Sequence, residues 1–205
     1  MAQNQPLSGP APAKAALRRE LLAARRALSP DALAASARAL SRSASRLPEL
    51  ADAHTVAAYV SVGTEPGTRE LLDALRAAGK RVLLPVLLPD NDLDWAVYEG
   101  PESLAGAAHP GKMRLLEPAG ARLGSEAVTG ADAVLLPGLA VDRRGMRLGR
   151  GGGSYDRVLE RLERAGAHPA LVVLLYDDEV VARVPEEPHD HPVRAVATPS
   201  GVVRF

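Results

Sequence analysis

Residues 135–157 read LLPGLAVDRRGMRLGRGGGSYDR, a stretch that joins an apolar run to a run of glycines and arginines. The apolar run 133–136 ends at Pro137-Gly138, which predicts a short buried strand. A helix is predicted to begin at Ser154, because apolar residues recur after it on one stripe: Val158, Leu159 and Leu162. We therefore expect a strand, a glycine-rich loop and a helix in succession.

The loop between that strand and that helix has the composition of an anion site. Five glycines and four arginines lie within the fifteen residues 139–153. Glycines allow backbone N–H groups to converge, and the first N–H groups of a helix have no partner within it, so both features favour an anion. The guanidinium groups of Arg147, Arg150 and Arg157 add forked donors that suit phosphate oxygens. Asp156, in the first turn of the helix, could also reach a phosphate-bound metal.

Two common phosphate-binding patterns do not fit this loop. No Gly-Lys-Ser/Thr closes it, which excludes a Walker loop, and its glycines are contiguous instead of spaced as in the dinucleotide-binding fingerprint. The other alternative is a flexible, solvated loop whose arginines face water. Contiguous glycines carry an entropic cost on folding that an idle loop would not need. A phosphate site is therefore the favoured interpretation.

The same residues, called the signature stretch below (135–157), resemble a motif of a known enzyme family. The motif is similar to that of 5-formyltetrahydrofolate cyclo-ligases, also called methenyltetrahydrofolate synthetases, in four places: PGLAVD (137–142), Gly145, RLGRGGG (147–153) and Tyr155-Asp156. The resemblance implies an enzyme of one-carbon metabolism that uses ATP and Mg²⁺. It would cyclise 5-formyltetrahydrofolate to 5,10-methenyltetrahydrofolate and release ADP and phosphate. Arg147, Arg150 and Tyr155 would then be the catalytic residues.

The composition disfavours several other classes of protein. The 205 residues hold 25 Lys and Arg against 25 Asp and Glu, so the net charge is zero and gives no general attraction to nucleic acid or to acidic membranes. The absence of cysteine excludes disulfides, thiolate catalysis and cysteine-ligated zinc. No apolar run is long enough to span a membrane, and no secretory signal pattern is present. We expect a cytoplasmic monomer whose partner is a small-molecule substrate.

Helical and strand patterns alternate along the chain, which predicts an α/β fold. We expect a single-domain, three-layer α/β/α arrangement with a mostly parallel sheet and the N-terminal helices packed on it. Residues 1–12 are expected to be a disordered tail and 13–205 the single domain. Helices are predicted at 13–28, 29–46, 68–78 and 154–165, strands at 55–60, 81–87, 133–136, 170–175 and 194–198, an edge or antiparallel strand at 94–99, and loops through most of 101–130.

The first predicted helix carries three cations on one face. Lys14, Arg18 and Arg25 lie within about 40° of one another on the helical wheel. Taken alone, such a face is more often simply solvated, although like charges repel unless an anion or a partner is near. The resemblance implies that a Lys and an Arg four residues apart on this helix contact ATP. It therefore assigns Lys14 and Arg18 to the phosphates and leaves Arg25 at the surface.

The resemblance also assigns three residues to the folate. Glu65 follows the strand predicted at 55–60, in a loop where open α/β sheets usually contact ligands. A carboxylate suits the pterin edge, because that edge offers a ring N–H and an amino group as two donors. Tyr155 matches the second of two tyrosines that follow the glycines in the family. Met113 stands where the family has an aromatic residue, and its thioether can still pack on a flat ring.

The sequence PHDHP at 188–192 suggests a metal site in two different ways. His189 and His191 could point to one side of an extended segment, but two imidazoles alone make an incomplete site, and a solvated loop is the simpler interpretation. The resemblance instead implies a Mg²⁺-linked aspartate in this segment. Mg²⁺ is usually bound through one or two carboxylates, waters and phosphate oxygens. We therefore predict Asp156 and Asp190 as the metal ligands.

The predicted ATP site combines the helix cations with the glycine-rich stretch: Lys14, Arg18, Arg147, Gly149, Arg150, Gly151, Gly152, Gly153, Ser154, Tyr155 and Asp156. Two other functions stay open at this point. One is a phosphate or sugar-phosphate binding protein on the same fold without ligase activity, from which ATP-dependent turnover would distinguish the enzyme. The other is a nucleic-acid-binding protein that uses arginine-rich helices, which the zero net charge and the scarcity of aromatic residues disfavour.

Overall fold

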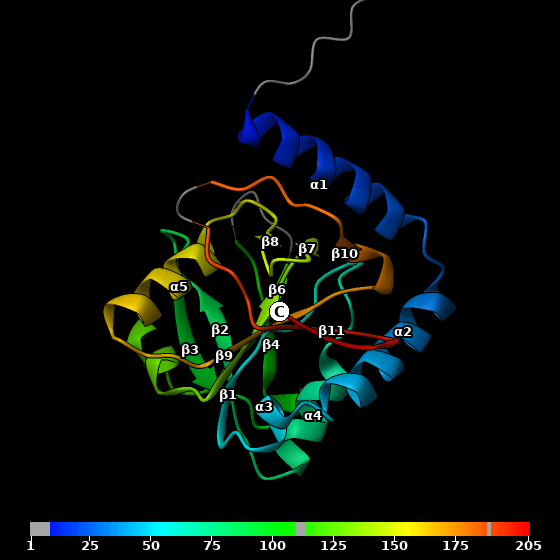
Figure 1. The fold of residues 1–205 in the computed structure, drawn as a ribbon. Helices are drawn as coiled ribbons and strands as arrows, with labels where there is room; N and C mark the ends of the chain where they lie inside the picture. The colour runs from blue at the N-terminus through cyan, green and yellow to red at the C-terminus, as the bar shows by residue number, and fades with distance from the viewer. Residues whose placement is uncertain (1–8, 110–113, 188–189) are drawn as a thin grey trace, which may run out of the picture.

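A computed structural model describes residues 9–109, 114–187 and 190–205 of the chain (Figure 1). Its centre is a seven-stranded sheet made of β1 (Thr55–Ala57), β2 (Arg81–Leu87), β3 (Leu93–Val97), β6 (Ala133–Pro137), β9 (Ala170–Leu174), β11 (Ala195–Thr198) and β12 (Gly201–Arg204). The strand order is β12-β11-β9-β6-β1-β2-β3. The five strands from β11 to β2 are parallel to one another. The edge strands β12 and β3 are antiparallel to their neighbours β11 and β2. The predicted, mostly parallel sheet is confirmed, as is the antiparallel strand near residue 94.

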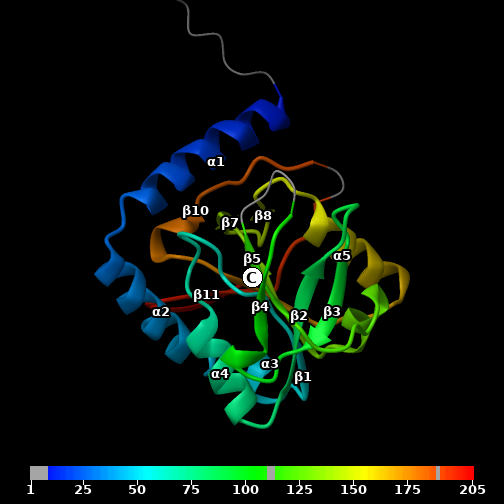
Figure 2. The same cartoon turned by 180° about the vertical axis from the view of Figure 1, so that it is seen from behind.

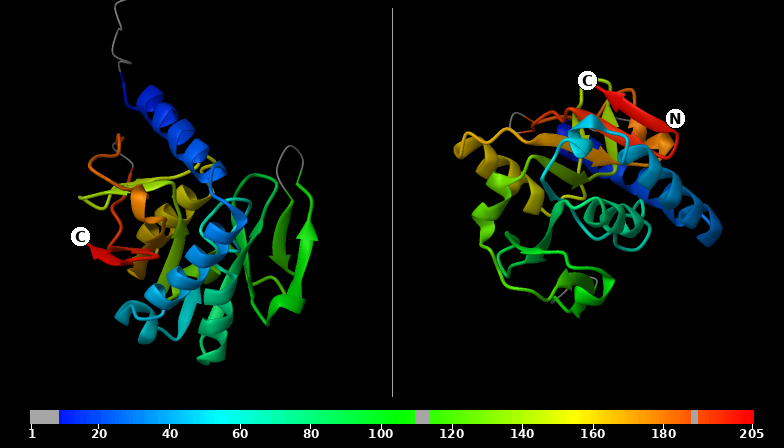
Figure 3. Two further views of the ribbon diagram at one scale, coloured as in Figure 1. Left: turned by 90° about the vertical axis from the view of Figure 1, so that its right-hand side faces the viewer. Right: turned by 90° about the horizontal axis from the view of Figure 1, so that it is seen from below.

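Apolar residues alternate between the two faces of this sheet, as the period of two in a strand requires. One face buries Val56 and its neighbours against α2, α3 and α4, which span Pro30–Ala44, Pro48–Ala51 and Arg69–Ala77. The other face buries Ala57 and its neighbours against α5 (Ser154–Arg164). Helices therefore cover both sides of the sheet (Figures 1 and 3), which confirms the predicted three-layer α/β/α fold.

The first helix, α1 (Pro10–Arg26), lies apart from the central sheet, as the front and back views show (Figures 1 and 2). Its buried Leu21 packs on Leu139, Leu148 and Val184, beside a three-stranded sheet in the order β10-β7-β8. These strands span Val180–Val181, Ala140–Asp142 and Arg147–Leu148. Of the two N-terminal helices, α2 packs on the central sheet as expected, whereas α1 packs on the small sheet to which the signature stretch contributes β7 and β8. Like the other described helices, α1 lacks the combination of length and apolarity needed to cross a membrane.

Two expectations about irregular segments need correction. The helix α1 begins at Pro10, so residues 10–12 are helical and not part of a disordered tail, while residues 1–8 lie outside the described part of the chain. Residues 101–130, expected to be loops, hold an antiparallel hairpin and two short 3₁₀ turns: β4 (Leu104–Ala107), β5 (Leu115–Pro118), η1 (Pro101–Ser103) and η2 (Ser125–Gly130). The two strands are four residues each and contain Gly106 and Pro118, so their periodicity is too weak to reveal them.

Arg25, expected at the surface, is buried, with 2% of its side chain exposed. Its Nε donates to Oε1 of Glu179 at 2.6 Å, and its Nη2 donates to the carbonyl oxygen of Gly138 at 2.7 Å. The guanidinium carbon also lies 5.5 Å from the ring centroid of Tyr176. The helical wheel could not show that α1 meets a carboxylate in the short turn η3 (Asp177–Glu179). A guanidinium can be buried there because it finds both a carboxylate and a carbonyl as acceptors.

Candidate functional site

A pocket of about 660 Å³ opens at the carboxyl ends of the parallel strands. Tyr59 follows β1, Leu87 ends β2 and Pro137 ends β6, and all three line the pocket. The signature stretch and two cations of α1 complete the lining. Ligands of open α/β sheets usually bind at this edge, where loops follow the strands and helix N-termini point.

Every predicted site residue that the structure describes lines this pocket. The structure brings together Lys14 and Arg18 from α1, Glu65 from the loop after β1, residue 147 and residues 149–156 from the signature stretch, and Asp190 from the C-terminal part. Met113 lies outside the described residues. Arg157, suggested above as a further phosphate donor, is not among the lining residues. Its Nη1 pairs instead with Oδ2 of Asp90 at 3.3 Å, so the structure does not bring Arg157 together with the other predicted phosphate ligands.

The turn at residues 142–146, which precedes the pocket arginines, is held by Asp142, which is fully buried. Its Oδ1 accepts hydrogen bonds from the backbone N–H groups of Arg144 and Met146, and its Oδ2 accepts one from the N–H of Val184. Burial alone would raise the pKa of Asp142, but these bonds and the guanidinium of Arg144 lower it. The charged carboxylate therefore fixes the signature stretch beside the segment that carries Asp190.

The contiguous glycines shape the loop in two different ways. Gly151 and Gly153 have φ angles of +90° and +77°, a region that favours glycine, and Gly153 is the N-cap of α5. Gly152 has no such angle, and a Cβ built on it would meet nothing within 4 Å. The loop conformation therefore explains Gly151 and Gly153, whereas Gly152 leaves an open space at the backbone on the wall of the pocket.

We predict that replacing Gly152 with alanine leaves thermal stability nearly unchanged and weakens ATP binding by about tenfold. A methyl group there would keep phosphate oxygens from the backbone N–H groups, and a charge-assisted hydrogen bond of this kind contributes roughly 1.5 kcal/mol or more. Calorimetric titration with ATP and thermal denaturation measure the two effects. Gly130→Ala is the matched control, because Gly130 also has open space around it and lies outside the pocket lining. Equal ATP affinity in both variants would remove Gly152 from the ATP site.

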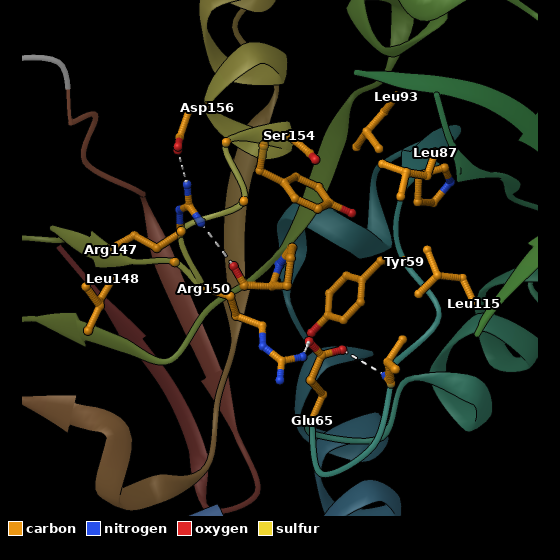
Figure 4. A pocket seen from close by; sticks show the side chains of 18 of the residues that line it. Tyr59, Glu65, Leu87, Leu93, Leu115, Arg147, Leu148, Arg150, Ser154 and Asp156 are labelled. Carbon is orange, nitrogen blue, oxygen red and sulfur yellow. Dashed lines mark hydrogen bonds and ion pairs between the residues drawn. The ribbon is translucent and has the colours of Figure 1, made fainter. Parts of the chain in front are cut away.

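The two signature arginines in the pocket contact carboxylates (Figure 4). Nη2 of Arg147 donates to Oδ1 of Asp156 at 2.8 Å, and its Nη1 donates to the carbonyl oxygen of Pro137 at 3.3 Å. Nη1 of Arg150 donates to Oε1 of Glu65 at 2.9 Å. These ion pairs link residues predicted for the phosphates to residues predicted for the metal and for the folate. The two halves of the predicted site are therefore in direct contact.

The two pocket cations of α1 tie that helix to both loops of the site. Nε of Arg18 donates to the carbonyl oxygen of Gly149 at 2.8 Å. Nζ of Lys14 donates to Oε2 of Glu187 and to Oδ2 of Asp190, both at 2.7 Å. Burial opposes the charge of Lys14, but the hydrogen bonds to Asp190 and then Glu187 raise its pKa above the ordinary value. A charged Lys14 therefore holds α1 against the 184–192 segment.

The carboxylates predicted as metal ligands, Asp156 and Asp190, line the pocket together with Arg147. Side-chain exposure is 53% for Asp156 and 18% for Asp190, and a second, smaller hollow is lined by both. His191 lines that hollow too, with its Nε2 3.8 Å from a carboxylate oxygen of Glu163, whereas His189 lies outside the described residues. Among the described residues, no three side chains of the metal-ligating types come together. This donor set suits a cation that takes its other ligands from phosphate and water, as Mg²⁺ does.

The wall of the pocket opposite Arg147 and Arg150 is apolar and includes Tyr59 and Tyr155. Tyr155 lines the pocket with its hydroxyl buried and without a hydrogen-bond partner in the described structure, and burial raises the pKa of that hydroxyl. Glu65 is held in place by its own loop, since its Oε2 accepts from the N–H of Val62 at 2.8 Å. The apolar side chains of this wall are Leu87, Leu93, Leu115 and Leu116. A flat ring with polar edges fits such a surface.

Several residues that line the pocket were not predicted from the sequence. Tyr59 lies within the strand predicted at 55–60 and two residues beyond the end of β1, so the strand-end rule could have placed it near the pocket. Glu187 belongs to an acidic pair just before the predicted Asp190, and nothing in its spacing indicates a contact with Lys14. Leu115 and Leu116 were assigned to a loop region, so their place in β5 on the pocket wall was hidden.

Comparison with known proteins identifies the relatives of this chain. The family model described as the 5-formyltetrahydrofolate cyclo-ligase family matches residues 10–199. The 5-formyltetrahydrofolate cyclo-ligase of Mycolicibacterium smegmatis is 44% identical over 155 residues, which cover 73% of this chain and 76% of the relative. The enzyme of the same name from Escherichia coli K12 is 33% identical over 180 residues, which cover 87% of this chain and 96% of the relative.

Solved structures show the same fold. The NMR structure of 5,10-methenyltetrahydrofolate synthetase from Aquifex aeolicus matches with a TM-score of 0.77 and 27% identity, and covers 93% of this chain and 92% of that one. The 5,10-methenyltetrahydrofolate synthetase of Mycoplasma pneumoniae matches with a TM-score of 0.67 at 20% identity, over 91% of this chain and 98% of that one. The matched length, the curated relatives and the shared fold agree with the glycine- and arginine-lined pocket, and the chain belongs to the 5-formyltetrahydrofolate cyclo-ligase family.

Proposed function

We propose that this protein closes the ring of 5-formyltetrahydrofolate in an ATP- and Mg²⁺-dependent reaction, with both substrates in the one pocket described above. Cyclo-ligase activity and the use of ATP follow from the family. The observation that carries the proposal is the Arg150–Glu65 ion pair, which joins the cationic, glycine-rich half of the pocket to its apolar half. We take one chain as the active unit, because it supplies every residue used here; a cytoplasmic location stays a prediction.

The chemistry requires activation of the formyl group. Its oxygen is a poor leaving group, and transfer of the γ-phosphoryl group of ATP to that oxygen makes a good one. N10 then attacks the activated carbon and gives up its proton, the carbon–oxygen bond breaks with loss of phosphate, and the methenyl bridge closes the five-membered ring. The protein need supply no nucleophile, because positioning and charge stabilisation are its main contributions to phosphoryl transfer.

The nucleotide half uses the residues around the glycines. The backbone N–H groups of residues 149–153 and the guanidinium groups of Arg147 and Arg150 would hold the phosphates. Lys14 and Arg18 would reach them from α1. Each of these cations already contacts a protein oxygen, so ATP binding would exchange those contacts for phosphate oxygens. Such an exchange keeps each of these cations paired with an oxygen acceptor.

The proposed metal ligands are Asp156 and Asp190. Their fit to Mg²⁺ rests on the donor set, which offers carboxylate oxygens on one wall of the pocket close to the proposed phosphate ligands. Bound Mg²⁺ would supply neutralisation of phosphate charge. Before ATP binds, the two aspartates also orient cations of the site, since Asp156 pairs with Arg147 and Asp190 with Lys14.

The folate half would be formed by the predicted residues Glu65, Tyr155 and Met113, together with the four leucines that line the apolar side of the pocket. Glu65 would accept the pterin N–H groups, and the four leucines would cover the faces of the ring system. Met113 stays a prediction, since it lies outside the described residues. Tyr155 lines the pocket directly after the glycine loop, and its side chain packs against both hydrophobic cores of the central sheet.

We predict that Glu65→Gln weakens the binding of 5-formyltetrahydrofolate by about tenfold and leaves ATP affinity nearly unchanged. Gln keeps the size of the side chain but replaces one acceptor oxygen with a donor, so one pterin N–H loses its charged partner, worth roughly 1.5 kcal/mol or more. Separate calorimetric titrations with each substrate measure the effect. Glu49→Gln serves as the control, because Glu49 pairs with Arg204 away from the pocket lining. A change confined to ATP would overturn the assignment of Glu65.

The experiment that tests the proposed function follows absorbance at the methenyltetrahydrofolate band, with 5-formyltetrahydrofolate and Mg²⁺, in the presence and absence of ATP. Growth of the band only with ATP supports the proposal. A protein that binds ATP but never forms the band would instead be the phosphate-binding, non-ligase alternative. Repeating the assay with a chelator in place of Mg²⁺ tests the metal separately, and an unchanged rate would remove Mg²⁺ from the proposal.

A further inference from the structure

Tyr59 is a buried side chain of the pocket that none of the roles above uses. It lies two residues beyond the end of β1, is 4% exposed and lines the pocket. Its backbone is fixed, because its carbonyl oxygen accepts a hydrogen bond from the hydroxyl of Thr68 at 2.8 Å. Figure 4 shows its ring extending toward Glu65, with the hydroxyl at the carboxylate end of that side chain. The position of the hydroxyl is therefore set by the fold.

The Tyr59 hydroxyl has no hydrogen-bond partner in the described structure. A buried hydroxyl without a partner destabilises a folded protein, and nearly all such groups in native proteins find one. The nearby carboxylate is already engaged, since Glu65 accepts from Arg150 through Oε1 and from the N–H of Val62 through Oε2. A costly polar group on a side chain that lines a ligand pocket is explained if the ligand supplies its partner.

The chemistry of the pterin ring identifies that partner. Its polar edge presents an amino group, then a ring N–H and then a carbonyl oxygen. A carboxylate can accept from the two donors but cannot pair with the carbonyl, which needs a donor beside it. Burial raises the pKa of the Tyr59 hydroxyl well above its ordinary value, so the group stays protonated and can donate.

We propose that the hydroxyl of Tyr59 donates a hydrogen bond to the carbonyl oxygen of the pterin ring, next to the N–H groups that Glu65 accepts. This inference rests on the proposed function, because it assumes that Glu65 marks the folate half of the pocket. It makes Tyr59 a binding residue that recognises the third group of the pterin edge. Together Glu65 and Tyr59 would then match all three groups in order.

The test is Tyr59→Phe, which removes the hydroxyl and keeps the ring. We expect the dissociation constant for 5-formyltetrahydrofolate, measured by calorimetry without ATP, to rise about tenfold. ATP affinity should stay within twofold, and the melting temperature of the free protein should be unchanged or higher, because a buried hydroxyl without a partner has been removed. Tyr98→Phe is the matched control. The Tyr98 hydroxyl donates to Asp73 at 2.6 Å and lies outside the pocket lining, so this variant should melt at a lower temperature and bind folate normally.

The possible outcomes distinguish a wrong role for Tyr59 from a wrong proposed function. If wild-type protein binds and converts the folate but Tyr59→Phe binds it equally well, the role of Tyr59 is wrong and the proposed function stands. If Tyr59→Phe lowers the melting temperature without weakening folate binding, the hydroxyl has a structural partner, such as a buried water, and the inference is again wrong. If wild-type protein neither binds nor converts the folate, the proposed function fails and takes the inference with it.

Discussion

Replacing Arg150 with alanine is expected to lower the ATP-dependent rate by about ten- to a hundredfold. A hydrogen bond to a charged group contributes roughly 1.5–3 kcal/mol, and each 1.4 kcal/mol is about a factor of ten in rate. In the variant, the phosphate would lose its contact with the guanidinium group, and Glu65 would lose the ion-pair partner that lies 2.9 Å away in the wild type. Both kcat and kcat/KM should fall, because charge on the transferring phosphoryl group is stabilised most in the transition state.

Arg157→Ala is the control for that experiment. The two arginines come from the same stretch and have similar side-chain exposure, 43% for Arg150 and 46% for Arg157. Arg157 lies outside the pocket lining and pairs with Asp90, so its loss should change the rate by less than about twofold, as for other exposed ion pairs. Steady-state rates with ATP varied at saturating folate measure both variants. Equal activity of the two would exclude Arg150 from the nucleotide site.

Replacing Arg25 with alanine is expected to cost about 3–5 kcal/mol of unfolding free energy. Glu179, whose side chain is 5% exposed, would be left as a buried charge without its partner, and breaking a buried pair in this way is strongly destabilising. The carbonyl of Gly138 would lose its donor as well. Urea denaturation followed by circular dichroism measures the change, and the slope of the transition checks that unfolding stays two-state.

Arg26→Ala provides the comparison for Arg25. Arg26 is the next residue of the same helix and is exposed, so its replacement should stay within about 0.5 kcal/mol of the wild type. A loss of similar size in the two variants would mean that helix propensity, and not the buried pair, determines the stability of α1. Because α1 carries Lys14 and Arg18, the Arg25 variant should also bind ATP less tightly at temperatures near its unfolding transition.

Much of this architecture could be predicted from the sequence, because the relevant signals are local. The strand before Pro137, the glycine run and the apolar stripe of α5 are each encoded within a few residues, and the structure has them within one or two positions. The place of Lys14 and Arg18 in the site was predicted through the spacing of a family motif, not through physical chemistry alone, and their pairing with Glu187, Asp190 and the carbonyl of Gly149 was not predicted. Their roles toward ATP stay predictions.

The features that could not be predicted depend on contacts between distant segments. Arg25 is buried because a carboxylate 154 residues away meets it, and a helical wheel carries no information about that partner. The hairpin β4–β5 forms from strands too short for a periodic signal. Tyr59 lies inside the strand predicted at 55–60 as one more apolar residue, and the missing partner of its hydroxyl is seen only in the structure.

The balance of charge in the pocket has a consequence for how nucleotide arrives. Among its described lining residues, four cations (Lys14, Arg18, Arg147 and Arg150) stand against five carboxylates (Glu65, Glu117, Asp156, Glu187 and Asp190). A surface without positive excess gives little long-range attraction for a polyanion, so encounter is governed by ordinary diffusion and depends only weakly on ionic strength. Selectivity then arises after contact, when carboxylates give up their arginines and lysine to the phosphates, and the residence time of the nucleotide, more than its capture rate, sets the affinity.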